Sequence, residues 1–244
     1  MNMIWSIAKR ELKGYFGSAV AYVFIVLFLI LCGFFTFQVG RFYEARQANL
    51  NAFFVWVPWL YLFLVPAITM RLWSEERRNK TLEVLLTLPV TTWQAVFGKF
   101  LAAWIFIGIA VVLTFPMVFS VYYLGNPDFG PIATGYLGAL FLAATYLAVG
   151  IFASAVSRSQ IISFIIGLVL CLFFVLVGWQ PVTSALQEYF PQIVVNFISS
   201  LSFNAHFDSI RIGVIDTRDI VYYVSFIAFM LCMTTAVLNN RRAN

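Results

Sequence analysis

Charged residues are scarce in this chain, and their scarcity limits where it can fold. Of its 244 residues, 15 are Lys or Arg and 10 are Asp or Glu, together 10% of the sequence. Soluble globular chains carry about 25% charged residues. Hydrophobic residues make up 62%, including 27 Phe, and the mean hydropathy is +0.92. A soluble fold of this size cannot remove so much apolar surface from water. The composition therefore excludes a soluble globular protein and predicts one solvated by lipid.

Long stretches without any charged residue set the expected architecture. Six of them reach the roughly 20 residues that a helix needs to cross a hydrocarbon core of about 30 Å. The alternating segments of about ten residues that a transmembrane β-barrel requires are not seen. We therefore predict an all-α polytopic membrane protein with six transmembrane helices, at approximately 19–40, 52–72, 99–123, 132–154, 161–179 and 220–239.

The segments between the spans are more polar. Residues 1–18 are expected to form an amphipathic helix at the membrane interface, although a simple positively charged flank explains them equally well. Residues 73–98 form one loop and residues 180–219 another. Within the second loop, 189–207 has no charge but several polar residues. This pattern favours a single surface helix, with a seventh span as the open alternative.

The positions of Lys and Arg predict the orientation. With the N-terminus inside, 11 of the 15 basic residues lie on the cytoplasmic side, and Arg41, Arg46, Arg211 and Arg218 lie outside. Because cytoplasmic loops of membrane proteins are enriched in Lys and Arg, both termini are expected to be cytoplasmic.

Residues for catalysis or metal binding are also scarce. His206 is the only histidine, and its neighbour Asp208 completes neither a zinc site nor a nucleophile–base pair. Gly98-Lys99 is followed by Phe100, so it does not form a Walker A motif. Ionisable residues are missing from the span centres, which argues against a proton-driven carrier. The chain is therefore expected to be no enzyme and to hold no cofactor or metal.

The loop at 73–98 carries the most informative pattern. Leu82, Leu85 and Leu86 form an apolar patch on a short predicted helix that Pro89 ends. Such a patch among charged residues is typical of a helix that docks into a protein groove, and a helix lying on lipid is the alternative.

At this loop the chain resembles the permease subunits of type-2 ABC exporters. Those subunits typically show an acidic pair, a Gly-Thr-x-Glu step, a leucine pair, Pro-Val-Ser/Thr and a Gly-Lys that leads into the third span. Lys80 stands where the family usually has Gly, and Ser18-Ala19 replaces the usual Ser-Pro. The start, 9–16 with Ala21-Tyr22, looks like the branch of gliding-motility and copper-site-maturation transporters. The matching residues, in order, are Glu75, Glu76, Thr81, Glu83, Leu85, Leu86, Pro89, Val90, Thr91, Gly98 and Lys99.

The resemblance implies a single ABC-2 transmembrane domain over 1–244. It implies a second permease copy or a sister permease as partner, two ABC ATPase subunits that bind ATP and Mg²⁺, and an auxiliary periplasmic subunit, with no nucleic acid. Spans one and five are then expected to meet across the dimer axis, with the small residues Ser163 and Gly167 at that interface. The residues implied to contact the ATPase and carry coupling are Glu75, Glu76, Thr81, Glu83, Leu85, Leu86 and Pro89, together with Arg158 in the turn 154–160.

The function implied is that of a permease subunit, which couples ATP hydrolysis in a partner chain to export of a substrate. Two other functions stay open. In the first, the chain is a membrane anchor that transports nothing and holds a cytoplasmic ATPase or an envelope assembly. In the second, it is an ion-coupled carrier without a nucleotide-binding partner. The substrate is not indicated, since lipid-facing surfaces demand the same aromatic residues as a hydrophobic cargo.

Overall fold

The computed structural model describes residues 3–44, 47–78 and 91–240. These residues form helices joined by short connections, and no strand occurs among them. The helices are α1 (Met3–Phe16), α2 (Ala19–Phe34), η1 (Phe35–Val39, a π-helix), α3 (Asn51–Thr69), α4 (Ser74–Arg78), α6 (Thr92–Val112), α7 (Pro116–Leu124), α8 (Phe129–Val156), α9 (Gln160–Leu176), α10 (Gln180–Tyr189), α11 (Gln192–Ser199), α12 (Phe203–Arg211) and α13 (Thr217–Asn240).

The expected spans are found as long apolar helical segments. Five are long and apolar enough to cross a membrane as they stand, and α9 with α10 makes a sixth candidate that is bent by 71°. The bend lies next to Pro181, which has no N–H for a continuous helix. The prediction of an all-α polytopic protein is therefore confirmed, with five or six candidate spans. The five unbent segments are Ala19–Val39, Asn51–Arg78, Thr92–Leu124, Phe129–Val156 and Thr217–Asn240.

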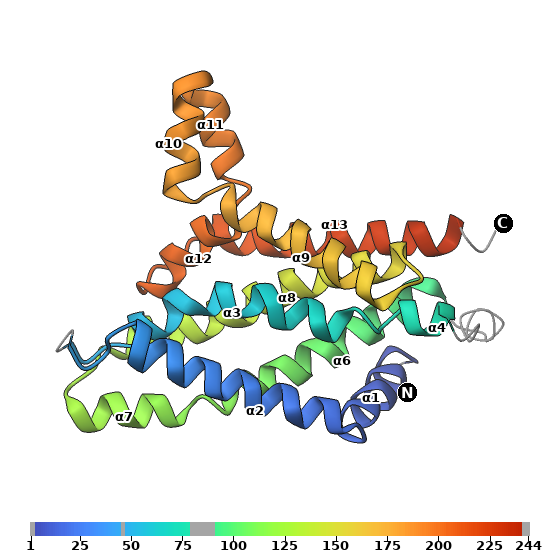
Figure 1. Cartoon of the computed structure of the whole chain (residues 1–244), viewed down its shortest axis with the longest axis horizontal. Helices are drawn as coiled ribbons and strands as arrows, with labels where there is room; N and C mark the ends of the chain where they lie inside the picture. The colour runs from blue at the N-terminus through green and yellow to red at the C-terminus, as the bar shows by residue number, and fades with distance from the viewer. Residues whose placement is uncertain (1–2, 45–46, 79–90, 241–244) are drawn as a thin grey trace.

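The long helices run roughly along one axis, so the molecule has two ends (Figure 1). One end carries α1, α4, the turn between α8 and α9 and the last residues of α13; we call it the α4 end. The opposite end carries α7 and α12, and we call it the α12 end. The start of α1 and the end of α13 therefore both lie at the α4 end (Figure 1).

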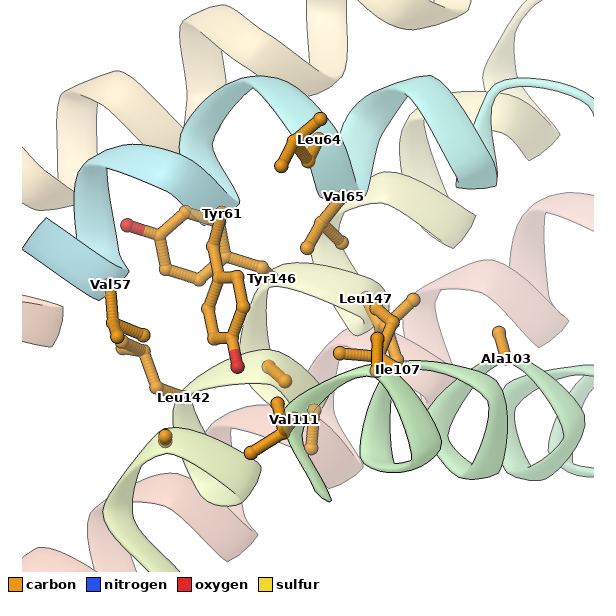
Figure 2. Close-up of a cluster of buried hydrophobic side chains, with 14 of the residues drawn as sticks. Val57, Tyr61, Leu64, Val65, Ala103, Ile107, Val111, Leu142, Tyr146 and Leu147 are labelled. Carbon is orange, nitrogen blue, oxygen red and sulfur yellow. The ribbon is translucent and has the colours of Figure 1, made fainter. Parts of the chain in front are cut away.

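Helix α8 is the centre of the bundle and contacts α3, α6, α9, α12 and α13. Figure 2 shows α3, α6 and α8 meeting through apolar side chains, with the Tyr146 hydroxyl donating to the Pro58 carbonyl at 3.0 Å. Where lipid surrounds the helices, such close packing drives their association. The labelled residues of this cluster are Val57, Tyr61, Leu64, Val65, Ala103, Ile107, Val111, Leu142, Tyr146 and Leu147.

Gly150 permits a close approach between α3 and α8. A Cβ atom at this position would lie 2.1 Å from Oγ1 of Thr69, well inside van der Waals contact. Only a residue without a side chain therefore fits between the two helices here. The contact fixes the last turn of α3, which leads directly into α4.

The polar segment after α9 differs from the single surface helix expected over 189–207. It is divided between α11 and the start of α12, and Ser202 begins α12 by accepting a hydrogen bond from Asn204 N. Neither helix is long enough to span a membrane. Helix α12 packs on α8, whereas α10 and α11 form a hairpin that projects from the bundle (Figure 1).

Candidate functional site

A buried lysine joins three helices at the α4 end. Lys99 of α6 has a side chain only 3% exposed, and its Nζ lies 2.7 Å from Glu76 Oε1 on α4 and 3.2 Å from Glu11 Oε2 on α1. The ring of Trp73 lies 5.3 Å from the same nitrogen. A buried ammonium is tolerated only when it is paired and hydrogen-bonded. Lys99 with its two carboxylates, which we call the Lys99 cluster, therefore ties α1 and α4 to α6.

Glu11 is held in its ionised form by this arrangement. Burial alone would raise the pKa of Glu11, but the charge of Lys99, together with the hydrogen bonds from Arg10 and Lys99, outweighs burial and lowers the pKa below its ordinary value. The Arg10 guanidinium lies 2.9 Å from Glu11 Oε1. The ion pair with Lys99 is therefore fully formed at neutral pH.

Helices α4 and α8 cap each other. Oγ of Ser154 on α8 accepts hydrogen bonds from Trp73 N at 3.0 Å and Ser74 N at 3.2 Å, and it donates to the Met70 carbonyl at 3.1 Å. These bonds satisfy N–H groups at the start of α4 that have no partner within the helix. One buried hydroxyl thus fixes the position of α4.

The return contact comes from Arg77 of α4. Its Nη1 donates to the Ala155 carbonyl at 2.7 Å and to the Ser157 carbonyl at 3.4 Å, where α8 ends. Hydrogen bonds from a charged donor are stronger than those between neutral groups. We call the contacts made by Ser154 and Arg77 the Ser154–Arg77 clamp. It holds α4 and the α8–α9 turn together as one unit.

The residues expected to contact an ATPase fall into two groups. In the described part of the chain, Glu75 and Arg158 are exposed at the α4 end, whereas Glu76 turns inward to Lys99. Glu76 is therefore placed to hold α4 rather than to present its charge at the surface. The other expected residues lie outside the described residues: Thr81, Glu83, Leu85, Leu86 and Pro89.

The small residues of α9 pack inside the chain. Ser163 is 2% exposed, and a Cβ on Gly167 would lie 3.5 Å from Pro66 Cβ and 3.6 Å from Ala153 Cβ. Their role at an interface between two chains stays a prediction, since their observed contacts are with α3 and α8. Large apolar side chains cover the exposed side of α9: Ile161, Ile162, Ile165, Val169 and Phe173.

Three of the residues that shape this site are not among those predicted from the sequence. Ser154 and Arg77 act through contacts about 80 residues apart in sequence, and no local pattern indicates them. Glu11 did leave a signal, because it stands three residues after Ala8 and four before Tyr15, on the apolar side of α1. A carboxylate on that side requires a buried cation, which Lys99 provides.

The α12 end holds a second polar cluster. His206 Nδ1 lies 2.6 Å from Asp219 Oδ1, and its Nε2 lies 2.9 Å from the Ser200 carbonyl. Ser209 Oγ donates to Asp219 Oδ2 at 2.6 Å, so the serine contacts the carboxylate and not the imidazole. This is not the geometry of a nucleophile activated by a base. The cluster joins α12 to α13, and the described residues contain no group that would hold a metal ion.

Comparison with known families agrees with this architecture. A family model described as ABC-2 family transporter protein matches residues 5–239, from the first turn of α1 almost to the end of α13. Comparison with curated proteins gives no significant match. The match covers nearly the whole chain, and the helices include five or six candidate spans. The chain therefore belongs to the ABC-2 transporter family, as a multi-pass membrane protein of the permease type.

Proposed function

We propose that this chain is the subunit that couples ATP hydrolysis in partner ABC ATPases to movement of a substrate across the membrane. The observation that carries the proposal is the Ser154–Arg77 clamp. It fastens α4, which continues in sequence into 79–90, to the turn that presents Arg158. Force applied to either segment would then reach α3 and α8 together.

The proposed orientation places the α4 end in the cytoplasm. Lys9, Arg10 and Lys13 of α1 and Arg71, Arg77 and Arg78 around α4 all lie at this end, in agreement with the enrichment of basic residues in cytoplasmic loops. Helix α1 would then lie at the cytoplasmic membrane surface, packed against α6. The expected membrane is the bacterial inner membrane.

The proposed assembly contains two ABC ATPase subunits and two permease chains, either copies of this one or this one and a sister. ATP and Mg²⁺ would be bound by the ATPases. Residues Leu85 and Leu86 would enter a groove of the ATPase, and Glu75 and Arg158 would contact its rim. Export, an auxiliary periplasmic subunit and membership of the gliding-motility and copper-site-maturation branch remain predictions from the resemblance.

Docking through the leucines is tested by replacing Leu85 and Leu86 with Asp. Two carboxylates cannot enter an apolar groove without a large desolvation cost, so the ATPase should no longer co-purify while the permease still inserts. If the ATPase remains bound in equal amounts with unchanged activity, docking through these leucines is wrong.

Coupling through the clamp is tested with Arg77→Gln and Ser154→Ala in the assembled complex in lipid nanodiscs. Each variant should keep the ATPase bound but reduce the stimulation of ATP hydrolysis by the permease. Because both contacts hold α4 to α8, the effects of the two substitutions on the stability of the permease should not add. The free energy of unfolding lost in the double variant should differ from the sum of the two single losses by about 0.5–3 kcal/mol. The matched controls are Arg218→Gln and Ser225→Ala, which replace exposed side chains elsewhere. Equal losses in the clamp variants and the controls would refute the proposed role of the clamp.

The two other functions give different outcomes in the same preparation. A membrane anchor would hold the ATPase through the same surface, but its ATP hydrolysis would not depend on any translocated molecule. An ion-coupled carrier would transport in liposomes from an ion gradient with no ATPase present. ATP-dependent transport that is lost in the clamp variants separates the proposed function from both.

A further inference from the structure

A cavity of about 410 Å³ lies at the α4 end, beside the Lys99 cluster. Helices α1, α2, α3, α4 and α6 all contribute to its wall. Its volume is within the range of about 300–1,000 Å³ that is usual for small-ligand sites. Ser154 and Arg77 of the clamp are not part of its wall, whereas Glu75, which is also expected to contact the ATPase, and Glu76 are.

The cavity is apolar on one side and charged on the other. The wall formed by the spanning helices includes Phe24 of α2, Ala67 and Ile68 of α3 and Phe106 of α6. The wall nearest the α4 end contains three carboxylates and two cations: Glu11, Glu75, Glu76, Arg71 and Lys99. An occupant must therefore be amphiphilic, with its apolar part toward the spans and its polar part toward α4.

Tyr15 lies in the wall of this cavity and carries a hydroxyl that the described residues do not use. Its hydroxyl is buried and has no hydrogen-bond partner in the described part of the chain. The ring is stacked on Phe106, with centroids 5.1 Å apart, so its position is fixed. Burial raises the pKa of Tyr15, which keeps the phenol protonated. A buried hydroxyl without a partner carries a desolvation cost, which an acceptor on a bound ligand would offset.

Arg71 and Glu75 supply opposite charges in a defined order. Both are exposed, and neither forms an ion pair with another described residue. Glu75 N donates to the Arg71 carbonyl at 3.3 Å, so the two residues are one helical turn apart along the chain. Glu75 comes after Arg71 in the chain, one turn further from the end of α3. Counted from the end of α3, the guanidinium therefore comes first and the carboxylate next.

We propose that this cavity binds a phospholipid with a zwitterionic head group that ends in a primary amine, as in phosphatidylethanolamine. The phosphate would lie at Arg71 and accept a hydrogen bond from Tyr15, the ammonium would lie at Glu75, and the start of an acyl chain would contact Phe24 and Phe106. The order of phosphate and amine from the acyl chain outward matches the order of Arg71 and Glu75 along the chain. Arg binds phosphate through two parallel hydrogen bonds, and an ammonium donates to a carboxylate.

The charges of the site discriminate between lipid classes. A head group with a phosphate and no amine would add a fourth negative charge to three carboxylates and two cations, with no further positive charge to compensate it. A choline head group carries the positive charge but has no N–H to donate to Glu75. Phosphatidylethanolamine is therefore expected to bind more tightly than phosphatidylglycerol or phosphatidylcholine.

The test measures binding of short-chain lipids to the purified full-length protein in detergent by native mass spectrometry. Dihexanoyl phosphatidylethanolamine should bind about tenfold more tightly than the glycerol and choline lipids, the effect of one additional charge-assisted hydrogen bond. Glycerophosphoethanolamine, which lacks acyl chains, should bind weakly. Equal binding of the three lipids would overturn the proposal, and tight binding of glycerophosphoethanolamine would overturn the assignment to a lipid.

Two variants and a control locate the site. Glu75→Gln should remove the preference for the ethanolamine lipid, and Arg71→Gln should weaken the ethanolamine and choline lipids alike. Arg78 lies on α4 like Glu75 but outside the cavity wall, so Arg78→Gln should change neither the preference for the ethanolamine lipid nor the affinity for any of the lipids. Equal effects of Arg78→Gln and Glu75→Gln would place the lipid elsewhere.

A labelling experiment on the unmodified protein gives an independent result. A phosphatidylethanolamine with a diazirine near the glycerol should label peptides from α2 and the end of α3, and excess dihexanoyl phosphatidylethanolamine should compete with it. Labelling confined to α13, or labelling without competition, would contradict the site.

Discussion

Replacing Lys99 with Met should destabilise the protein by about 3 kcal/mol. The substitution removes the cation between Glu11 and Glu76 and leaves two carboxylates facing each other with side chains 18% and 20% exposed. Removing one partner of a buried ion pair costs roughly 3–5 kcal/mol. The low end of that range applies because each carboxylate keeps about a fifth of its surface accessible to solvent.

The predicted loss of stability in Lys99→Met can be checked with a matched control and a rescue variant. Lys13→Met, at an exposed position of α1, should change stability by no more than about 0.5 kcal/mol. Adding Glu11→Gln and Glu76→Gln to Lys99→Met removes the uncompensated charges, so more than half of the lost stability should return. The order of stability expected is wild type, then the triple variant, then Lys99→Met.

The assay is reversible unfolding in mixed micelles at neutral pH, followed by tryptophan fluorescence. Trp73 is suited to it because its side chain is fully buried and lies beside Lys99. Two results would refute the reasoning. One is a loss for Lys99→Met no larger than that for Lys13→Met, and the other is a triple variant less stable than Lys99→Met alone.

Three further predictions concern the packing and charge of the bundle. The folded pKa of Glu11 lies below its ordinary value of 4.5, so the contribution of its carboxylate to stability is complete above about pH 4.5 and is lost as the pH falls through the folded pKa. The stability difference between wild type and Glu11→Gln, measured by unfolding in micelles, should therefore shrink with acidification. A difference that grows would contradict this sign. Gly150→Ala should cost about 1–3 kcal/mol because its Cβ would overlap Thr69 Oγ1, and Thr69→Ala should restore part of the loss in thermal melts. His206→Ala removes the imidazole from the buried carboxyl group of Asp219, which keeps only its hydrogen bond from Ser209, and should cost about 1–3 kcal/mol. Hydrogen exchange should become faster in α12 and stay unchanged in α4, and equal changes at both ends would show that the cluster is not local.

The helical type of the long apolar segments could be predicted from the sequence, because a chain this poor in charge has few other ways to satisfy its backbone inside a membrane. Five of the candidate spans are long enough to cross the membrane as they stand, so tertiary contacts are not needed to recognise them. The sixth is the bent pair of α9 and α10, and the absence of charge does not show its bend. The helix expected over 189–207 is divided between α11 and the start of α12, because the side chain of Ser202 caps a new helix; its place at the membrane surface stays a prediction. Periodicity does not register such a break, whereas capping does.

The site was less predictable, for a different physical reason. The sequence marks Glu75, Glu76 and Lys99 as unusual, but only the fold brings Glu11 to Lys99 and Ser154 to Trp73. Ser163 and Gly167 illustrate the limit of reading small residues from a sequence. Small residues allow close approach of any neighbouring helix, and here the neighbours are α3 and α8 of the same chain.

The central claim, that the α4 end docks an ABC ATPase, is tested most directly by site-specific photocrosslinking in native membranes. A photoreactive amino acid is placed at position 75, 158 or 218, and crosslinked proteins are identified by mass spectrometry. All three positions are exposed, but 75 and 158 lie at the α4 end and 218 at the α12 end. We expect a P-loop ATPase to be crosslinked from 75 and 158 and not from 218. The account is contradicted if neither 75 nor 158 captures such an ATPase, or if 218 captures it as efficiently.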